Sequence, residues 1–560
     1  MRRVLSLLMS FGLAVSACQA APSGSSGPAG TPGAPGGSQA APSEVAAVTP
    51  PPLNRDKDTL VIAVDAFSGD FDPASSYLLA QGLLWRGTYD SLIRLKGSSA
   101  TEVEAALATT WEPNADSSSW TFHLRPNVKF TDGTPFDAQA VKTAYTRTIK
   151  IALGTQLILG SFITDPDKQI VVVDPMTVRF DLGRSVPHFD LVVAAEWGTG
   201  IASPKVFTDP ASAGKDQGHT WLSSHAVGTG PYVLTSIEPD NQVVLDQNPD
   251  YWGGWDGSHF KKVIIRQVPD GATRRQLIES GDVDIAIASS AEDTAAIKAD
   301  PRFYEPNQQN LAMDYIILGD YGKLAKPEAR QAMTYLWPYD DYVSSIGKGQ
   351  QARPNSFFPD LLTTAVKDYS PKTDLDHAKS LLDAAGIAPG TTFTFEYYAG
   401  FGKDEAQVMQ AQLESVGMHL DIQEKAYGAF SSDLTTDRPV DQRADMYYWG
   451  WWPDYNDASD YSWILFNSDA APDKCACYNS GYYKNADVDK IINDGFTEAD
   501  QSKLDSSFKE AQRIMGQDVD PPIIPTGQPI DTTYYRIDIQ GQVSNPLYIF
   551  TWDFYALNRG

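Results

Sequence analysis

Residues 120–136 read Trp-Thr-Phe-His-Leu-Arg-Pro-Asn-Val-Lys-Phe-Thr-Asp-Gly-Thr-Pro-Phe, and this stretch does more than any other to decide the fold. Trp120, Phe122 and Leu124 alternate with Thr121 and His123, which predicts a strand with one buried face. The Thr-Asp-Gly-Thr-Pro run predicts a turn. A helix is expected to follow over residues 138–148.

Segments on either side of this stretch also have the patterns of strands and helices. The predicted strands are 59–64, 170–182 and 419–423, and the predicted helices are 373–387 and 404–416. Asp174-Pro175 predicts a turn within the second of these strands. Because strands alternate with helices along the chain, the sequence indicates an α/β fold.

Single residues in these elements carry more specific predictions. The valines at 171, 173 and 178 are expected in the core. Thr373 and Asp376 have the spacing of a capping box, and Gly386 is expected to end the helix that they start.

Length and composition bound the class of protein. The chain has 560 residues, so at roughly 100–200 residues per domain we expect two to four domains. Lys and Arg number 44 against 71 Asp and Glu, which gives a formal charge of -27. A chain of this charge is repelled by nucleic acid, and no nucleic-acid partner is expected. The excess of negative charge is also expected to favour solubility.

The first residues resemble the signal of an exported lipoprotein. Arg2 and Arg3 precede an apolar stretch, and Val15-Ser16-Ala17-Cys18 resembles the bacterial lipobox. The resemblance implies that residues 1–17 are a signal peptide and that Cys18 receives a lipid. An ordinary signal cleaved near Ala17 or Ala20 is the alternative.

The segment that follows is rich in Ala, Pro, Gly and Ser. It offers little apolar surface to bury, so residues 18–56 are expected to form a disordered linker. A lipid at its start would anchor the protein to the cell membrane, and the body would work outside the cytoplasm.

Several sequence segments, in order along the chain, resemble segments of the large solute-binding proteins of ABC importers. The specific resemblance is to family 5, whose members bind peptides, nickel complexes and some oligosaccharides. After residues 120–136 the segments include Gly228-Thr229-Gly230-Pro231-Tyr232, Asn248-Pro249-Asp250-Tyr251-Trp252, Gly281-Asp282-Val283-Asp284-Ile285 and Ala329-Arg330-Gln331-Ala332. The likeness covers about residues 57–560. Each segment has a structural explanation as turn or core, so the segments identify the fold and do not form the site.

The resemblance implies a two-lobed periplasmic-binding-protein fold of type II, with a hinge on which the lobes close around a ligand. Lobe I is expected from residues 57–102, 227–306 and 522–560. Residues 103–226 are expected to form an extra subdomain on lobe I, and residues 307–521 are expected to form lobe II.

The candidate binding site lies in Gly450-Trp451-Trp452-Pro453-Asp454, which resembles the family's Gly-Trp-x-x-Asp segment. In peptide binders of the family, the matching aspartate pairs with the ligand's α-ammonium group and the preceding backbone pairs with the peptide. An extended peptide presents unpaired N–H and C=O groups that a strand can satisfy. Asp454 could instead cap or turn the loop. Asp457 lacks the proline that follows it in many members, which leaves the geometry beyond it open.

Other residues complete the candidate site. Trp449, Trp451 and Trp452 are expected either in the core or in the cleft, where they would cover peptide side chains or stack on a sugar. Strand alternation would place Trp449 and Trp451 on one face and Trp452 on the other. On lobe I, the family position of a second backbone contact falls on the segment Ser76-Tyr77-Leu78.

Cys475 and Cys477 are the remaining cysteines once Cys18 is lipidated. An exported protein favours a disulfide between them, although the ring would be small and a regular strand would hold them too far apart. Free thiols and a metal-binding pair are the alternatives.

The expected function is therefore capture of a solute, most simply a peptide, for import through a separate permease and ATPase. An oligosaccharide or a metal chelate is the alternative ligand. The sequence has no Gly-x-Ser-x-Gly, His-Glu-x-x-His or Gly-x-x-x-x-Gly-Lys motif, so an exported hydrolase is disfavoured and no cofactor or metal is expected. A monomer is expected.

Overall fold

The computed structural model describes residues 48–66, 70–75, 79–288, 290–305, 310–475, 477–548 and 552–560, except the side chains of residues 79–81 and 83. Residues 48–560 form one compact unit. Within the described ranges, no helix combines the length and the apolar character needed to cross a membrane. The predicted signal peptide, the lipidation site Cys18 and the linker up to residue 47 lie outside the described residues.

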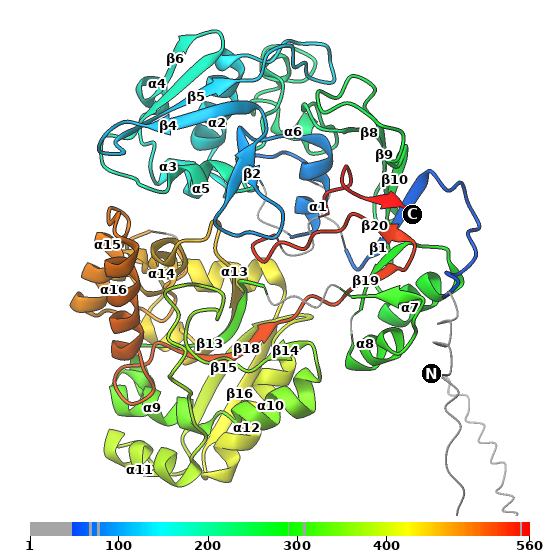
Figure 1. Ribbon diagram of the computed structural model, residues 1–560. Helices are drawn as coiled ribbons and strands as arrows, with labels where there is room; N and C mark the ends of the chain where they lie inside the picture. Colours follow the sequence, from blue (N-terminus) through cyan, green and yellow to red (C-terminus); the bar gives the residue numbers. More distant parts are fainter. Residues whose placement is uncertain are drawn as a thin grey trace, which may run out of the picture. The chain divides into compact units, whose positions relative to one another are not determined.

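In the described part of the chain, segments predicted for lobe I form a seven-stranded sheet (Figure 1). Its order is β12 (Phe303–Tyr304), β19 (Thr533–Arg536), β11 (Ile285–Ile287), β1 (Thr59–Val64), β10 (Lys262–Gln267), β9 (Gln242–Gln247) and β8 (Tyr232–Glu238). The apolar run of β1 is explained by its central position, since it pairs in parallel with both β10 and β11. The accompanying helices are α1 (Leu79–Thr88), α7 (Gly271–Ser280) and α8 (Ala291–Lys298).

A buried carboxylate joins both ends of this lobe. Asp284 is fully buried and forms ion pairs with Arg55 at 2.5 Å and Arg559 at 2.8 Å. Arg536, itself 1% exposed, approaches it at 3.5 Å. The second carboxylate oxygen accepts the backbone N–H of Val61 at 2.9 Å. The Gly-Asp-x-Asp run therefore supplies an electrostatic junction between segments that are far apart in sequence.

A four-stranded antiparallel sheet is built from the segment predicted as the extra subdomain. Its order is β4 (Ala108–Pro113), β5 (Ser119–Leu124), β7 (Thr177–Asp181) and β6 (Ile170–Asp174). Its helices are α2 (Ala138–Ile151), α3 (Gln156–Gly160), α4 (Pro166–Gln169), α5 (Phe189–Ala194) and α6 (His219–Leu222). The predicted strand at 120–124, the helix after it and the turn at Asp174-Pro175 are confirmed. Val178 is fully buried as predicted, whereas Val173 is 52% exposed and its prediction was wrong, because Ile170 and not Val173 turns inward on β6.

The subdomain is fixed to lobe I by buried contacts. Asp72, which is fully buried, accepts two hydrogen bonds from the guanidinium of Arg147 on α2, at 2.9 and 2.5 Å. Trp85 on α1 meets Trp197 edge to face, with ring centroids 5.1 Å apart. The short ladder of β2 (Ile93–Leu95) and β3 (Val103–Ala105) lies across the predicted boundary at residue 103. The subdomain and lobe I are therefore held as one body.

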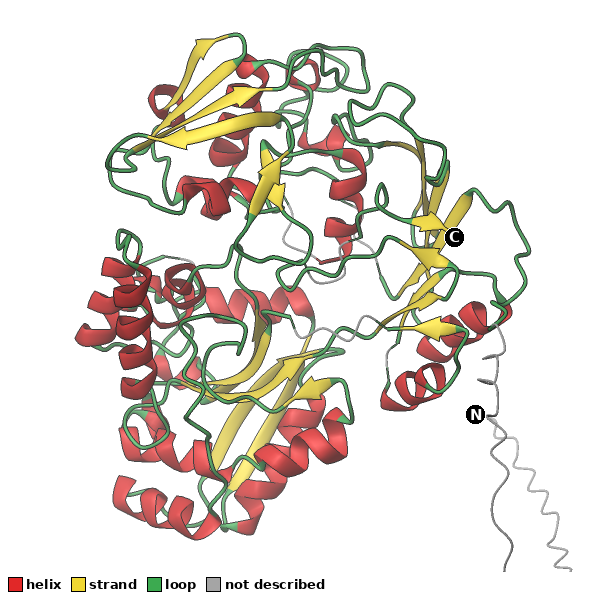
Figure 2. Ribbon diagram, viewed as in Figure 1, coloured by secondary structure: helices red, strands yellow, loops and turns green. Residues whose placement is uncertain are grey.

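The third large sheet of the described residues is six-stranded and carries helices on both faces (Figure 2). Its order is β14 (Gln351–Ala352), β18 (Ile523–Pro529), β13 (Met313–Leu318), β17 (Met446–Trp451), β15 (Thr392–Tyr398) and β16 (His419–Lys425). Core residues of α9 (Pro327–Leu336), α11 (Leu375–Ala385) and α12 (Lys403–Ser415) pack with Tyr448 and its neighbours on one face. Those of α13 (Tyr427–Thr435), α14 (Ala458–Phe466) and α16 (Gln501–Ile514) pack with Trp449 on the other.

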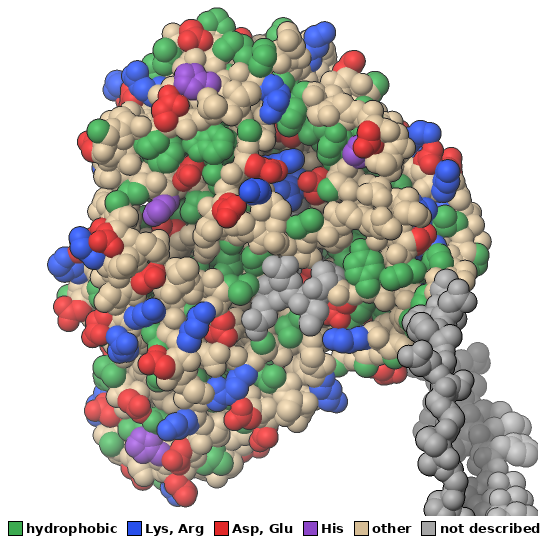
Figure 3. Space-filling view, viewed as in Figure 1, with side chains coloured by type: hydrophobic (Ala, Val, Ile, Leu, Met, Phe, Trp, Pro, Cys, Tyr) green, Lys and Arg blue, Asp and Glu red, His purple; other side chains and the backbone are tan. Residues whose placement is uncertain are grey.

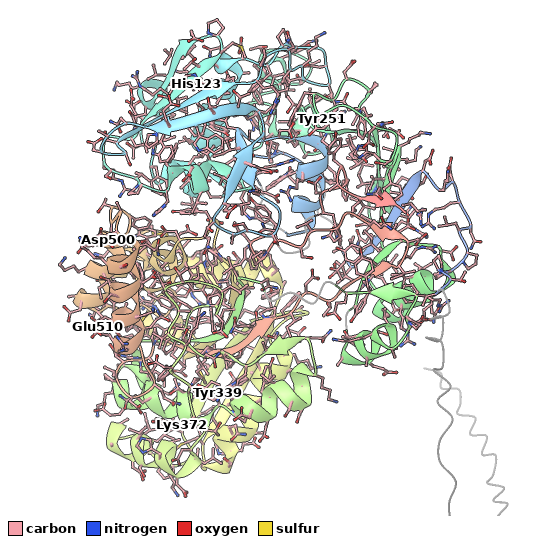
Figure 4. All side chains as sticks on the ribbon, in the orientation of Figure 1. His123, Tyr251, Tyr339, Lys372, Asp500 and Glu510 are labelled. Atoms are coloured by element: carbon pink, nitrogen blue, oxygen red, sulfur yellow. A yellow bond between two sulfur atoms is a disulfide. The ribbon has the colours of Figure 1, made fainter. Side chains whose placement is uncertain are left out.

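Among the described residues there are also two more α-helices, a small ladder and five short 3-10 or π helices. The short helices are η1 (Pro204–Phe207), η2 (Gly322–Leu324), η3 (Val343–Gly347), η4 (Val440–Gln442) and η5 (Ser468–Ala470). The two α-helices are α10 (Tyr339–Tyr342) and α15 (Ala486–Gly495), and the ladder pairs β20 (Ile539–Gln540) with β21 (Asn558–Arg559). Figure 4 labels Tyr339 on α10, and it labels Asp500 and Glu510 on α16. Asp500 is the N-cap of α16, since its side chain accepts the backbone N–H groups of Ser502 and Lys503.

Two predicted boundaries differ from the structure. The linker was expected to extend to residue 56, but Pro51 is buried and its carbonyl accepts a hydrogen bond from Arg536 at 2.7 Å. Polar contacts can hold a segment that has little apolar surface, which composition alone does not reveal. Residues from 522 were expected in lobe I, but β18 pairs with β13 of the six-stranded sheet, so the chain returns only between β18 and β19.

Helix α11 begins one residue later than its predicted capping box. The side chain of Asp374 accepts the backbone N–H of His377 at 2.9 Å, whereas the Thr373 hydroxyl donates to the carbonyl of Trp337. Gly386 ends the helix in the left-handed region with φ of 82°, as predicted. The cap is therefore Asp374, the residue after the predicted Thr373.

Asp374→Ala should lower the free energy of unfolding by about 1 kcal/mol, because it removes this cap. Chemical denaturation followed by circular dichroism measures the change. Asp376→Ala, in the first turn of the same exposed helix end, is the matched control and should change stability less. An equal loss in both variants would mean that the cap contributes nothing of its own.

Charged side chains are interspersed on the surface. On the face drawn in Figure 3, acidic and basic side chains alternate over all the coloured elements and no single patch of one sign dominates. On this face the acidic side chains are thus spread out, in keeping with a role in solubility.

Candidate ligand-binding site

The strand β17 delivers the candidate site to one edge of the six-stranded sheet. It pairs in parallel with β15, which pairs in parallel with β16, so the carboxyl ends of all three strands lie at the same edge. Ligands of open α/β sheets bind outside the carboxyl ends of the strands. The chain leaves β17 at Trp451 and reaches Asp454 three residues later. The sequence motif is thus carried to the edge where a ligand would be expected.

Asp454 lies in a compact acidic turn. Its side chain is largely buried, with the residue 7% exposed, and its backbone N–H donates to the carboxylate of Asp460 at 2.9 Å. Asp457 is the N-cap of α14 and accepts the backbone N–H groups of Ser459 and Asp460. Asp457 therefore caps α14, and the two roles predicted for Asp454, binding an ammonium group or shaping the loop, stay predictions.

Two acids of this turn have a raised pKa. Burial raises the pKa of Asp457, and burial together with the charges of Asp454 and Asp457 raises the pKa of Asp460 well above its usual value. A positive charge near this turn would favour the ionised forms of its carboxyl groups. Chemically, the turn is suited to an ammonium group. Asp457 and Asp460 were not predicted as site residues, although Asp-x-x-Asp before an apolar run is a capping signal.

Gly450 is required by a close approach from the neighbouring strand. It lies opposite Asp314 of β13, and a Cβ atom at residue 450 would stand 2.8 Å from the Asp314 carboxylate. Gln351 donates to the same carboxyl group at 2.8 Å. The glycine of the motif therefore leaves room for the partly buried carboxylate of Asp314, near the end of the strand.

Asp314 has a pKa raised to about 7, first by burial and then by the charge of Glu405. The folded state keeps a proton that the unfolded chain releases near its ordinary pKa of about 4. The free energy of unfolding should therefore fall as pH rises from about 4 to about 7. Denaturation curves across this range should show a smaller fall for Asp314→Asn. Asp441→Asn, at an exposed position, should keep the wild-type slope, and an unchanged slope in Asp314→Asn would contradict the assignment.

Aromatic rings cover the other face of β17. Trp449, 9% exposed, stacks on Tyr478 with ring centroids 5.3 Å apart, and Trp451 approaches the same ring at 6.1 Å. The two tryptophans thus share one face, as alternation predicted. Both indole N–H groups are buried without a hydrogen-bond partner among the described residues. Such donors can bind a ligand's acceptor atoms or an ordered water. Tyr478 was not predicted, because no sequence pattern links it to β17.

A disulfide stands directly before Tyr478. The structure joins Cys475 and Cys477, with Cα atoms 5.2 Å apart, and the backbone N–H of Cys477 donates to the carbonyl of Cys475. Among the described residues, no three His, Cys, Asp or Glu side chains are grouped to hold a metal ion. Tyr478, which contacts both tryptophans, is the next residue after this disulfide.

The remaining predicted residues are Trp452 and the segment 76–78. Trp452 lies just past the end of β17 and is partly exposed. Ser76, Tyr77 and Leu78 lie outside the described residues, so their predicted contact from lobe I stays a prediction.

Comparison with known families shows the family of this chain. The family of bacterial extracellular solute-binding proteins, family 5, matches residues 102–473 by its middle region. The chain belongs to that family. Family 5 proteins bind solutes outside the cytoplasm, as their description states. The matched region contains the extra subdomain, β17 and the Asp454 turn.

Curated relatives and solved structures of family 5 cover nearly the whole folded body. The probable D,D-dipeptide-binding periplasmic protein DdpA of Escherichia coli K12 is 29% identical over 478 residues, covering 82% of this chain and 87% of that protein. Di/tripeptide-binding protein 2 of Pseudomonas aeruginosa is 26% identical, covering 87% of this chain and 93% of its own.

The fold follows from a structural likeness. The ABC transporter-associated periplasmic binding protein DppA of Helicobacter pylori, solved in complex with peptide STSA, has a TM-score of 0.77 to this chain. It is 22% identical and covers 90% of this chain and 98% of its own. The predicted fold class, a two-lobed type II periplasmic-binding-protein fold of α/β architecture, is confirmed.

Proposed function

We propose that this chain captures a short peptide between its two lobes and delivers it to an ABC importer. The observation that carries the proposal is the position of Asp454, a buried carboxylate just beyond the carboxyl end of β17. A carboxylate there can bind the peptide's α-ammonium group, and such a charge-assisted bond contributes about 1.5–3 kcal/mol. The names of the relatives, which bind D,D-dipeptides, di- and tripeptides, support the same ligand class.

The backbone of the motif supplies the second part of the recognition. Gly450, the last residue but one of β17, has no side chain, so a peptide strand can approach its N–H and C=O groups closely. Trp449 and Trp451 can contact the peptide's side chains from the same edge. Selectivity for the amino end with tolerance of side chains is the expected result.

The protein acts as a membrane-anchored carrier in this proposal. Cys18 carries the lipid, and residues after it tether the folded body outside the cytoplasm. The disulfide between Cys475 and Cys477 supports an oxidising compartment. The body works as a monomer that meets a separate permease and ATPase, and it binds its solute without turning it over.

Calorimetric titration of residues 48–560 with trialanine tests the proposal. We expect binding of one peptide per chain, much weaker binding of N-acetyl-trialanine, and intact peptide recovered afterwards. Native mass spectrometry of protein purified without denaturation gives an independent readout, because a closed cleft retains its ligand. A ladder of peptide masses agrees with the proposal. A hexose-spaced adduct, a metal chelate or hydrolysed peptide would each replace it with another function.

A further inference from the structure

Side chains of the extra subdomain contact lobe II beside the candidate site. The ring of Phe162, which follows α3, lies 6.2 Å from Tyr455 and 6.3 Å from Phe496, edge to face in both cases. The guanidinium of Arg184 stands 5.3 Å from the ring of Phe162 and 5.7 Å from that of Phe496. Aromatic pairs of this geometry and cations above rings attract one another. Four side chains from two bodies thus form one cluster.

The two halves of the cluster belong to different bodies. Phe162 and Arg184 lie in the subdomain that the Asp72–Arg147 pair fixes to lobe I. Tyr455 and Phe496 follow β17 and α15 on lobe II. Opening a two-lobed binding protein separates lobes at their mutual contacts. A contact between these rings therefore exists only while the lobes are together.

The cluster is also adjacent to the proposed ligand-binding carboxylate. Tyr455 follows Asp454 directly in sequence and is 4% exposed. Its own surroundings include the charges of Asp454, Asp457, Asp460 and Arg184. The charge of His188, from the subdomain, acts on Asp457. The turn that holds Asp454 is consequently covered from the subdomain side.

We propose that Phe162 and Arg184 are positioning residues that form a closing latch, in which the extra subdomain grips Tyr455 and Phe496 and so holds the Asp454 turn in its ligand-binding place. The subdomain then contributes to ligand binding without touching the ligand. The coupling to peptide affinity rests on the proposed function, whereas the latch itself is a property of the two lobes. Removing it lowers the fraction of binding-competent closed protein, and the apparent dissociation constant rises by the same factor.

Distance measurements between spin labels test the latch without depending on a ligand. Labels go on cysteines introduced at Lys168 in the subdomain and Lys490 on α15, whose side chains are 84% and 72% exposed. In residues 48–560 the two native cysteines are joined to each other, so only introduced cysteines take the label. Pulsed electron resonance is recorded with and without trialanine for the wild type, Phe162→Ala, Phe496→Ala and the double variant. Arg184→Met serves as a milder variant at an exposed position.

The expected result is a short-distance population in the wild type that each single variant reduces, with no further reduction in the double variant, because both remove one contact. The affinity for trialanine should fall about 10-fold in Phe162→Ala. Because Phe162 is 4% exposed and also packs on Phe189, Phe162→Ala should lower the melting temperature as well, so the same direction of change in affinity in Arg184→Met, at an exposed position, separates the latch from a loss of stability. Leu157→Ala, 38% exposed on α3, is the matched control and should change neither the affinity nor the melting temperature.

Two results would overturn the latch: no short-distance population in the wild type under any condition, or the same distribution in Phe162→Ala and wild type. A purely structural role of Phe162 would lower the melting temperature and leave the distances unchanged, which also counts against it. If no peptide binds to the wild type, the peptide assignment fails, and the distances still decide the latch.

Discussion

Asp454→Asn should weaken the binding of trialanine about 10- to 150-fold, which corresponds to the loss of one charge-assisted hydrogen bond of about 1.5–3 kcal/mol. The amide keeps the shape of the side chain and removes its charge, so the loss reports the electrostatic attraction to the ammonium group. Isothermal titration calorimetry at constant ionic strength measures the change.

The ligand supplies the sharper control for this experiment. N-acetyl-trialanine has no ammonium group, so Asp454→Asn and wild type should bind it with the same low affinity. Asp473→Asn, at an exposed position in the segment before the disulfide, should bind trialanine like the wild type. If Asp454→Asn weakened both peptides equally, Asp454 would act on the shape of the turn and not on the ammonium group.

Asp284→Asn should lower the free energy of unfolding by about 3–5 kcal/mol, because breaking a buried ion pair leaves uncompensated charge in the interior. The substitution removes the negative charge that Arg55, Arg536 and Arg559 share. Chemical denaturation followed by tryptophan fluorescence gives the midpoint and slope from which the change is obtained.

A neighbour in the same motif provides the comparison. Asp282 is only partly buried and bonds to Asn54 and Ser280, so Asp282→Asn should cost about 1 kcal/mol or less. Similar losses in the two variants would show that burial at Asp284 adds nothing. A stability of Asp284→Asn within 1 kcal/mol of wild type would mean that the arginines find other partners, with Asp538 the nearest for Arg536 and Arg559.

Local patterns predicted much of the fold. The alternation at Trp120, Phe122 and Leu124, the run of β1 and the stop at Gly386 are each determined by neighbouring residues, and each was found where expected. Predictions failed where a distant group decides. Val173 had the composition of a core strand, but the register of β6 against β7 turns it outward. Pro51 has the composition of a linker residue, but Arg536, near the other end of the chain, donates a hydrogen bond to its carbonyl.

The residues of the candidate site also fall into two groups, those that a local motif predicts and those that distant contacts bring in. Gly450, Trp451 and Asp454 form a motif of consecutive residues, which a sequence displays directly. The Tyr478 ring, the Asp314 carboxylate and the Phe162 latch reach the same region from other elements, through pairing and packing that spacing does not encode. Asp457 is an intermediate case, because its capping pattern is present in the sequence although the residue was not predicted as a cap.

The junction at Asp284 also brings the two ends of the folded body together. Arg559 bonds to the backbone carbonyl of Lys57 at 3.3 Å as well as to Asp284. A linker of a few residues could therefore join these ends, and the chain could be reopened at another surface loop. Such a circular permutant would move the end that carries the predicted membrane tether, and the residues of the candidate site would stay unchanged. A fluorescent reporter inserted at the joined ends would turn lobe closure into an optical signal.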